Sequence, residues 1–90
     1  MPNAIRDKSF SFALRIIKLA RYLVDKKKEF VLARQLIRSG TAIGSLVREA
    51  EHAETKRDFI HKMSIALKEA NETEYWLELL HQSGYLATPA

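Results

Sequence analysis

The chain has 90 residues, 47% of them apolar, with three glycines, two prolines and no cysteine, and it carries a net charge of +4 at neutral pH. This length allows one small domain with a modest core, and the composition favours an ordered, mostly helical protein over a disordered one. The absence of cysteine excludes a disulfide framework and a thiolate metal site.

The charges are distributed unevenly along the chain. Residues 1–48 carry eleven Lys/Arg against three Asp/Glu, a net +8, whereas residues 49–90 carry four against eight, a net −4. This asymmetry is typical of a nucleic-acid-binding surface, but it also allows the basic front of one subunit to dock on the acidic back of the next. Charges on every turn of the first apolar segment exclude a signal-peptide core and a membrane span, so we expect a cytoplasmic protein without membrane contact.

The first predicted helix covers about residues 7–25. Its apolar side chains recur at steps of three and four residues, as they do on one face of a helix. We expect the following residues to face the core: Phe10, Ala13, Leu14, Ile17, Ala20 and Val24. The run DKKKEF, which begins at residue 25, breaks this pattern and ends the helix.

The second predicted helix, about residues 29–53, contains two glycines, Gly40 and Gly44. Each glycine costs a helix about 1 kcal/mol relative to alanine. They share one broad face with other small or apolar residues: Ala33, Leu36, Ile37, Ile43, Val47 and Ala50. We therefore predict a helix-packing strip on which another helix, the first or a fourth, approaches closely. The alternative is a local kink that begins at Ser39.

The third predicted helix covers about residues 56–83. Thr55 is expected to cap its start, with Asp58 three residues later as a weak capping box, and Gly84 is expected to end it. The short connection makes the second and third helices antiparallel neighbours. One face alternates steps of four and three residues, which is typical of a helix-bundle seam. The seam residues are Phe59, Met63, Ala66, Ala70, Thr73, Leu77 and Leu80.

A second apolar stripe lies on nearly the opposite side of this helix. It contains Ile65, Trp76 and Leu79, together with the acidic Glu69 and Glu72. A helix that is apolar on two faces is normally buried on both, and three helices do not easily supply both partners. We therefore predict that these five residues form an oligomer interface.

The last residues of the chain resemble the start of a fourth helix. Thr88 is a typical N-cap residue, and Pro89 is favoured at the first helical position. An ordinary tail is the alternative. We expect an all-α, up-and-down bundle of the four-helix type that forms one domain over residues 1–90, with three long helices in this chain and the fourth missing.

Two Glu-x-x-His pairs carry the only enzymatic signal in the sequence. Carboxylate-bridged di-metal bundles use this spacing, which occurs at Glu49 with His52 and at Glu78 with His81. Glu78 lies about 33 Å along the third helix from its start, so the two pairs cannot share one site in a subunit. Pairing His52 with His61 across the turn remains a remote alternative. We expect no enzyme activity, cofactor or metal, since no catalytic triad or phosphate-binding glycine loop is present either.

The basic residues form two continuous polar stripes. In the first helix Lys8, Arg15, Lys18 and Lys26 share one side with Tyr22, and the second helix carries the other stripe, with the polar residues Arg34, Arg38, Thr41, Ser45, Arg48 and His52. Such cations can track a phosphate backbone, while a tyrosine can stack on an unpaired base. The alternative is the solvated face that every bundle helix needs. The predicted phosphate contacts are Lys8, Arg15, Lys18, Arg34, Arg38 and Arg48.

The stretches RQLIRSGTAIGSLVREA and KRDFIHKMSIALKEANETEYWLELL, in this order and spacing, closely resemble the four-helix-bundle proteins of the 23S ribosomal RNA intervening-sequence family. The resemblance covers about residues 8–86. It implies a small, cytoplasmic, bacterial up-and-down bundle that assembles into a homopentamer. A related branch serves as the accessory protein of the reverse transcriptase in diversity-generating retroelements, where a basic surface contacts nucleic acid and the polymerase.

The resemblance carries no catalytic residues over to this chain. The family motif positions that match are Arg38, Ser39, Gly44, Glu49 and Ala50. Two departures stand out: Ser45-Leu46 replaces the Ala-Asn of many members, and the family's fourth helix has no counterpart. Loss of that helix exposes apolar surface, which favours aggregation, swapping or a changed oligomer.

The favoured hypothesis is a non-catalytic, self-associating bundle that offers basic helix faces to RNA or DNA, as an accessory to a larger enzyme such as a reverse transcriptase. The alternative is a homo-oligomeric assembly or protein-interaction module with no nucleic-acid role. A carboxylate-histidine metal protein is the remote third hypothesis.

Overall fold

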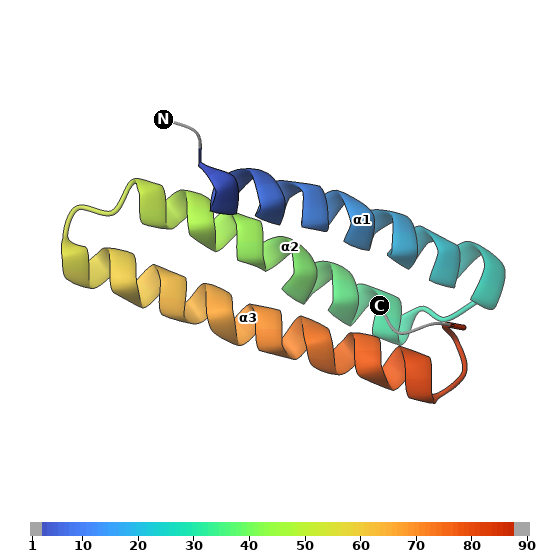
Figure 1. Cartoon of the computed structure of the whole chain (residues 1–90). Helices are drawn as coiled ribbons and strands as arrows, with labels where there is room; N and C mark the ends of the chain where they lie inside the picture. Colours follow the sequence, from blue (N-terminus) through green and yellow to red (C-terminus); the bar gives the residue numbers. More distant parts are fainter. Residues whose placement is uncertain (1–2, 88–90) are drawn as a thin grey trace.

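The computed structural model describes residues 3–87, and these form three helices. They are α1 (Ala4–Lys27), α2 (Val31–Glu51) and α3 (Lys56–Gln82). Each helix runs antiparallel to the one before it, in an elongated unit of 44 × 21 × 19 Å (Figure 1). The predicted all-α, up-and-down arrangement is confirmed for three helices, and no helix in the described range is long and apolar enough to cross a membrane.

Local signals explain where the helices begin and end. The Thr55 side chain accepts a hydrogen bond of 3.0 Å from the backbone N–H of Asp58, so the predicted cap of α3 is confirmed. Gly84 follows the helix with a φ of +90°, a conformation that favours glycine. Asn3 caps α1 by accepting from the Arg6 N–H, which starts this helix three residues earlier than predicted. The predicted start of a fourth helix at Thr88 lies outside the described residues.

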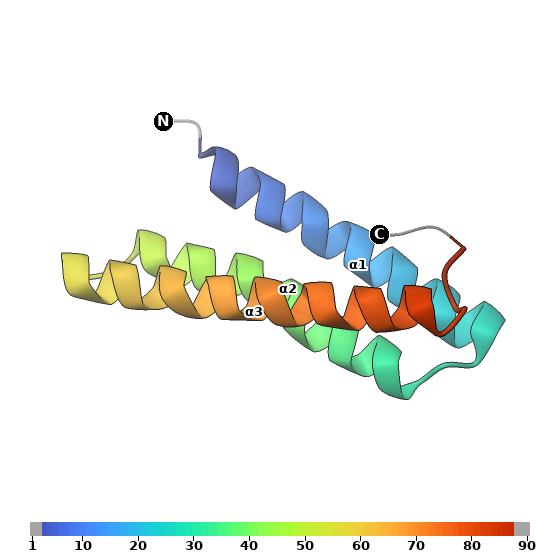
Figure 2. The ribbon, with the colours of Figure 1, turned by 60° about the horizontal axis from the view of Figure 1, so that its bottom comes forward.

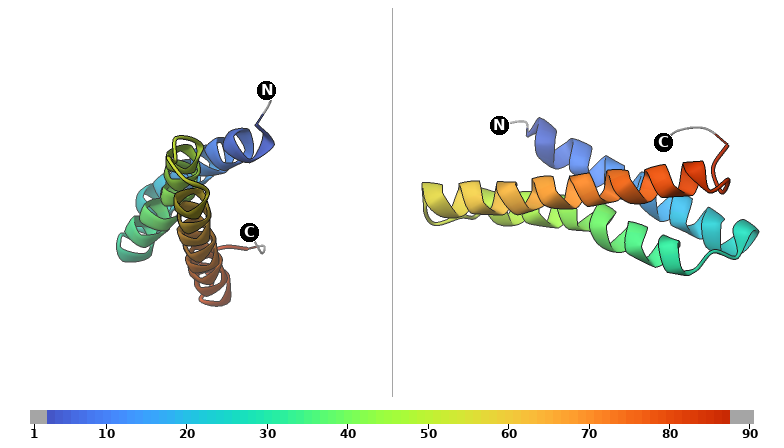
Figure 3. Two further views of the ribbon diagram at one scale, coloured as in Figure 1. Left: turned by 90° about the vertical axis from the view of Figure 1, so that its left-hand side faces the viewer. Right: turned by 90° about the horizontal axis from the view of Figure 1, so that it is seen from below.

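Helix α2 occupies the centre of the molecule. Both α1 and α3 pack on it, whereas no Cα atom of α1 lies within 8 Å of a Cα atom of α3. The N-terminal half of α1 diverges from α3, so the two helices form the arms of a V with α2 at its base (Figures 2 and 3).

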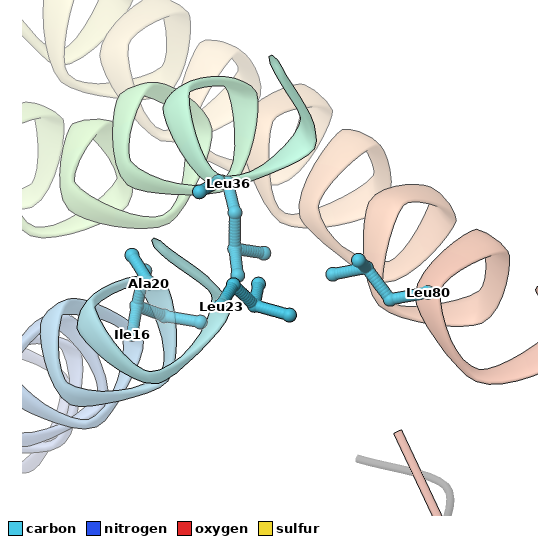
Figure 4. Close-up of a cluster of buried hydrophobic side chains, with 6 residues drawn as sticks. Ile16, Ala20, Leu23, Leu36 and Leu80 are labelled. Carbon is cyan, nitrogen blue, oxygen red and sulfur yellow. The ribbon is translucent and has the colours of Figure 1, made fainter. Parts of the chain in front are cut away.

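The core lies where the arms converge. Ile16, Ala20 and Leu23 of α1 meet Leu36 of α2 and Leu80 of α3 (Figure 4), and Ala33 completes the buried cluster. Of these three α1 residues, only Ala20 belongs to the face that periodicity predicts.

The predicted core face of α1 is wrong by about one residue. Phe10 and Leu14 are about half exposed, whereas Ser9, Ile16 and Leu23 are buried. Apolar side chains lie on two sides of this helix, and a shift of one residue rotates the face by about 100°.

The two glycines of α2 lie under α1. A Cβ atom added at Gly40 would lie only 2.9 Å from both Cγ1 and Cγ2 of Ile16, and one added at Gly44 would lie 3.5 Å from the carbonyl oxygen of Ser9. The predicted close helix approach is confirmed, and the approaching helix is α1. Helix α2 is continuous through both glycines, so they do not interrupt it.

A buried polar contact fixes α3 against α2. The Thr73 hydroxyl lies 2.8 Å from Ser39 Oγ and 2.8 Å from the carbonyl oxygen of Glu69, while the Ser39 hydroxyl donates to the carbonyl of Gln35 at 3.1 Å. Ser39 and Thr73 are both almost fully buried. Because a register shift would separate these two buried hydroxyls and place other side chains opposite them, the pair favours the observed alignment of α2 with α3.

Candidate functional site: basic helix faces and an apolar groove

Helix α1 is the most basic surface element of the structure. It contains seven Lys/Arg and two Asp, a net +5, and all seven cations are exposed. Of these seven, only Arg6 forms an ion pair within residues 3–87, at 3.9 Å from Glu51. The remaining cations therefore keep their full hydrogen-bonding capacity for an anionic partner.

Tyr22 lies among these cations. It is 43% exposed, and the Lys27 ammonium lies 6.0 Å from the centre of its ring. A solvated aromatic ring beside a cation can stack on an unpaired base while the cation contacts a phosphate.

Three of the predicted phosphate contacts can be placed by their aromatic neighbours on α1. Lys8 and Arg15 line a shallow hollow on the same side of α1 as Phe12. Arg48 of α2 lies instead over the ring of Phe10, 5.4 Å from its centre. Phe10 and Phe12 point to opposite sides of the helix, because two residues correspond to about 200° of rotation. Lys8 and Arg15 therefore face a different direction from Arg48.

Arg38 is already paired within its own chain. Its guanidinium forms an ion pair with Glu69 of α3 at 3.2 Å and a second with Glu72, and its Nε donates to Gln35 at 3.2 Å. The sequence places Arg38 among the phosphate contacts and the two glutamates at an oligomer interface. In the structure these side chains pair with one another across α2 and α3, and two carboxylates face one guanidinium, so a phosphate would have to compete with both glutamates for Arg38.

The predicted interface residues of α3 are half-buried. Trp76 packs against the core cluster of its own chain, and its indole N–H is buried without a hydrogen-bond acceptor among residues 3–87. Ile65 and Leu79 are likewise half-covered along the same stripe. Part of the apolar area that the sequence assigns to a partner subunit is therefore covered inside this chain.

A second hollow with basic residues lies beside the connection between α2 and α3. It is lined by Ser45, Arg48, Glu49, His52 and Lys62. Glu49 accepts a hydrogen bond of 2.9 Å from the Lys62 ammonium, which raises the pKa of Lys62 above its usual value. Glu49, which the sequence analysis pairs with His52, therefore bonds to a lysine in the structure. No three His, Cys, Asp or Glu side chains gather into a metal-binding group within the described range.

An apolar groove lies between the two arms of the V. It has a volume of about 930 Å³, with Ile43 of α2 at its base. Its walls are formed by residues of α1 and α3: Ile5, Lys8, Ser9, Phe12, Ala70, Thr73, Glu74, Leu77, Glu78, His81 and Gln82. The sequence predicts the seam to which Ala70 and Leu77 belong, but it gives no sign that α1 stays away from them and leaves them uncovered.

The arrangement offers two binding surfaces, a basic helix and an apolar groove, on a three-helix frame. The sequence model of the 23S rRNA-intervening sequence protein family matches residues 2–90. The chain belongs to this family. The family resemblance drawn from the sequence is therefore confirmed.

This intervening-sequence family member is also similar to a solved structure. A crystal structure at 1.70 Å resolution of a protein of unknown function from the S23 ribosomal protein family of Bacteroides thetaiotaomicron shares 57% sequence identity with it. The match covers 92% of this chain and 77% of that chain, with a TM-score of 0.91. None of the proteins with curated descriptions matches the chain.

Proposed function

We propose that this family member is a non-catalytic, self-associating helical bundle that binds RNA or DNA through α1. The observation that carries the proposal is the set of exposed cations on this one rigid helix, of which only Arg6 has an acidic partner in the described part of the chain. A solvated helix face needs polar side chains, but it does not need one sign of charge. The excess of cations favours an anionic partner over simple solvation.

The dimensions of α1 suit a polyanion. Its cations run from Arg6 to Lys27, which spans about 32 Å at 1.5 Å per residue. Duplex DNA carries one phosphate charge per about 1.7 Å of its axis, so a helix of this length can contact several phosphates at once. Each contact releases counterions, and binding is therefore expected to weaken steeply as salt is added.

Fluorescence anisotropy with a structured RNA and a duplex DNA, over a series of salt concentrations, tests this proposal. The variant Arg15→Gln/Lys18→Gln/Arg21→Gln removes three exposed cations of α1 and leaves Lys8, which lines the groove, unchanged. If all three contact phosphates, the slope of log K against log salt falls by about 2.7, at about 0.9 for each contact.

A charge-matched control lies on α3. Lys56→Gln/Arg57→Gln/Lys68→Gln removes three exposed cations of another helix, and we expect it to keep the wild-type slope. Equal slopes for the two triple variants, or no binding by the wild type at low salt, would refute nucleic-acid binding through α1.

The groove favours a second candidate, a homo-oligomeric assembly module without a nucleic-acid role. An apolar surface of this kind on a small protein indicates an interaction site. A helix laid in the groove would complete the four-helix architecture that the sequence predicts. Sedimentation velocity over a range of protein concentrations tests self-association, including the pentamer implied by the resemblance, and a monomer at all concentrations would contradict both candidates. Cytoplasmic location stays a prediction.

A further inference from the structure

The end of the molecule where α1 turns into α2 combines aromatic rings with lysines. Tyr22 is 43% exposed and Phe30 is 56% exposed. Between them in the chain lies the run Lys26, Lys27 and Lys28, and all three lysines are exposed. Solvated rings interleaved with cations are typical of surfaces that bind single-stranded nucleic acid, because the rings stack on bases while the cations contact phosphates.

The face of the Tyr22 ring is accessible to a planar group. The Lys27 ammonium lies over this ring, 6.0 Å from its centre, which is the outer limit of a cation–π contact. A lysine side chain is flexible along its four-carbon stem, so it can move aside and leave the ring face to a base. The same ammonium then remains close enough to contact the phosphate of the stacked nucleotide.

Lysines lie on both sides of Tyr22 along the same side of α1. Lys18 precedes it by four residues and Lys26 follows it by four, so each lies about 6 Å along the helix axis and about 40° around it. All three side chains are exposed. The α1 residues that line the groove lie between Ile5 and Phe12, so this row of side chains is separate from the groove. A strand laid along the row meets a cation before and after the ring.

Acidic side chains offset only part of this positive charge. From Lys18 to Phe30 the sequence contains five Lys/Arg and two acids, Asp25 and Glu29. The Glu29 carboxylate accepts a hydrogen bond of 2.6 Å from the backbone N–H of Leu32, in the first turn of α2. A carboxylate that binds the free N–H groups at a helix start is stabilised there, so Glu29 already has a partner in the fold. The surplus of cations at this end stays available to an anionic ligand.

We propose that this end of the molecule, residues 18–30, binds unpaired nucleotides, with bases stacked on Tyr22 and Phe30 and phosphates held by the neighbouring lysines. The inference rests on the proposed binding of RNA or DNA through α1 and names its substrate class as single strands and loops rather than duplexes. In a duplex the faces of the bases are covered by the adjacent base pairs, so only the cations contribute to binding. A single strand also offers its bases to the two rings.

Fluorescence anisotropy at one fixed salt concentration tests this inference, with an oligothymidine as the single strand and the same oligothymidine annealed to oligodeoxyadenosine as the duplex. The variant Tyr22→Leu/Phe30→Leu removes both rings and keeps every charge. We expect it to bind the single strand about fivefold more weakly, or weaker still, and to bind the duplex as the wild type does. Tyr22→Phe keeps the ring and is expected to keep the wild-type affinity for the single strand.

Tyr75 of α3 supplies the matched control for an exposed aromatic side chain. It is 54% exposed, but Glu72 and Glu78 lie three residues before and after it on the same helix. Acidic neighbours repel a phosphate backbone. Tyr75→Leu is therefore expected to leave the affinity for both ligands unchanged. Circular dichroism and sedimentation velocity on each variant check that the helices and the mass of the assembly are those of the wild type.

The outcomes separate this inference from the proposed function. If the double variant binds both ligands as the wild type does, stacking is overturned and α1 binds phosphates alone. An equal loss of affinity for the single strand and the duplex also overturns it, because stacking requires an unpaired base. A changed mass of the double variant assigns the rings to assembly and overturns it as well. A wild type that binds neither ligand at low salt overturns the nucleic-acid role itself, and this inference with it.

Discussion

The two glycines of α2 should respond in opposite directions to the same substitution. Replacing glycine by alanine inside a helix gains about 0.8–1.0 kcal/mol from helix propensity alone. At Gly44 the new methyl group lies 3.5 Å from its nearest neighbours, which is ordinary contact. We therefore expect Gly44→Ala to stabilise the protein by up to about 1 kcal/mol.

At Gly40 the new methyl group would meet the branched part of Ile16 at 2.9 Å. Ile16 is buried, and atoms so close to its backbone cannot move aside without shifting α1. Overpacking of this kind costs about 1–3 kcal/mol, which exceeds the gain in propensity. We expect Gly40→Ala to destabilise the protein by about 1 kcal/mol net, or to lower Tm by about 4–8 °C for a domain of this size.

Thermal and urea unfolding, followed by circular dichroism at a fixed protein concentration, measures both substitutions, because association also shifts apparent stability. The background Ile16→Ala removes both of the crowded carbon atoms. In that background Gly40→Ala should become stabilising, although Ile16→Ala alone costs about 2–5 kcal/mol. If Gly40→Ala stabilises the wild type as much as Gly44→Ala does, the close approach of α1 is not the reason for the glycine.

Three further predictions concern single contacts. Thr73→Val should cost about 1 kcal/mol in urea unfolding, and adding Ser39→Ala should cost less than the sum of the two single effects, because both remove one hydrogen bond. Thr55→Ala should cost about 1 kcal/mol, seen as a lower Tm, because α3 loses its N-cap. Glu49→Gln should return the pKa of Lys62 toward its usual value, measured by NMR titration. Since that pKa is raised in the folded state, the stability that the shift contributes is present below the unfolded-state pKa of about 10.4 and is lost as the pH rises through the folded-state pKa; a loss that began as the pH rose from neutral would contradict this.

Residues close together in the sequence gave the most reliable predictions. The helix cap at Thr55 and the helix end at Gly84 depend on a few neighbouring residues, and both are where the sequence places them. The close approach of another helix at Gly40 is also predictable, because glycine destabilises a helix and is expected on its apolar face where a second helix packs closely. The sequence does not show which helix approaches.

Contacts between distant residues were not predictable in the same way. Helix α1 has apolar side chains on two sides, so periodicity alone cannot choose between the face of Phe10 and that of Ile16. Helix α2 determines which face of α1 is buried, because the absence of a side chain at Gly40 leaves room for the branched side chain of Ile16. Arg38 and Glu69 are 31 residues apart, and nothing local tells an ion pair within the chain from one between two subunits.

The sequence by itself therefore determined that this protein is three antiparallel helices with a basic first helix, because helix periodicity, capping and charge are properties of short segments. Only the tertiary structure decided that α1 and α3 both pack along α2, while their side chains meet only at the core near Leu80 and their Cα atoms stay more than 8 Å apart. That outcome depends on the angle at which α1 crosses the glycines of α2, and the angle is set by side-chain packing between residues far apart in the chain. The groove between the helices, and the separation of Lys8 and Arg15 from Arg48, follow from it.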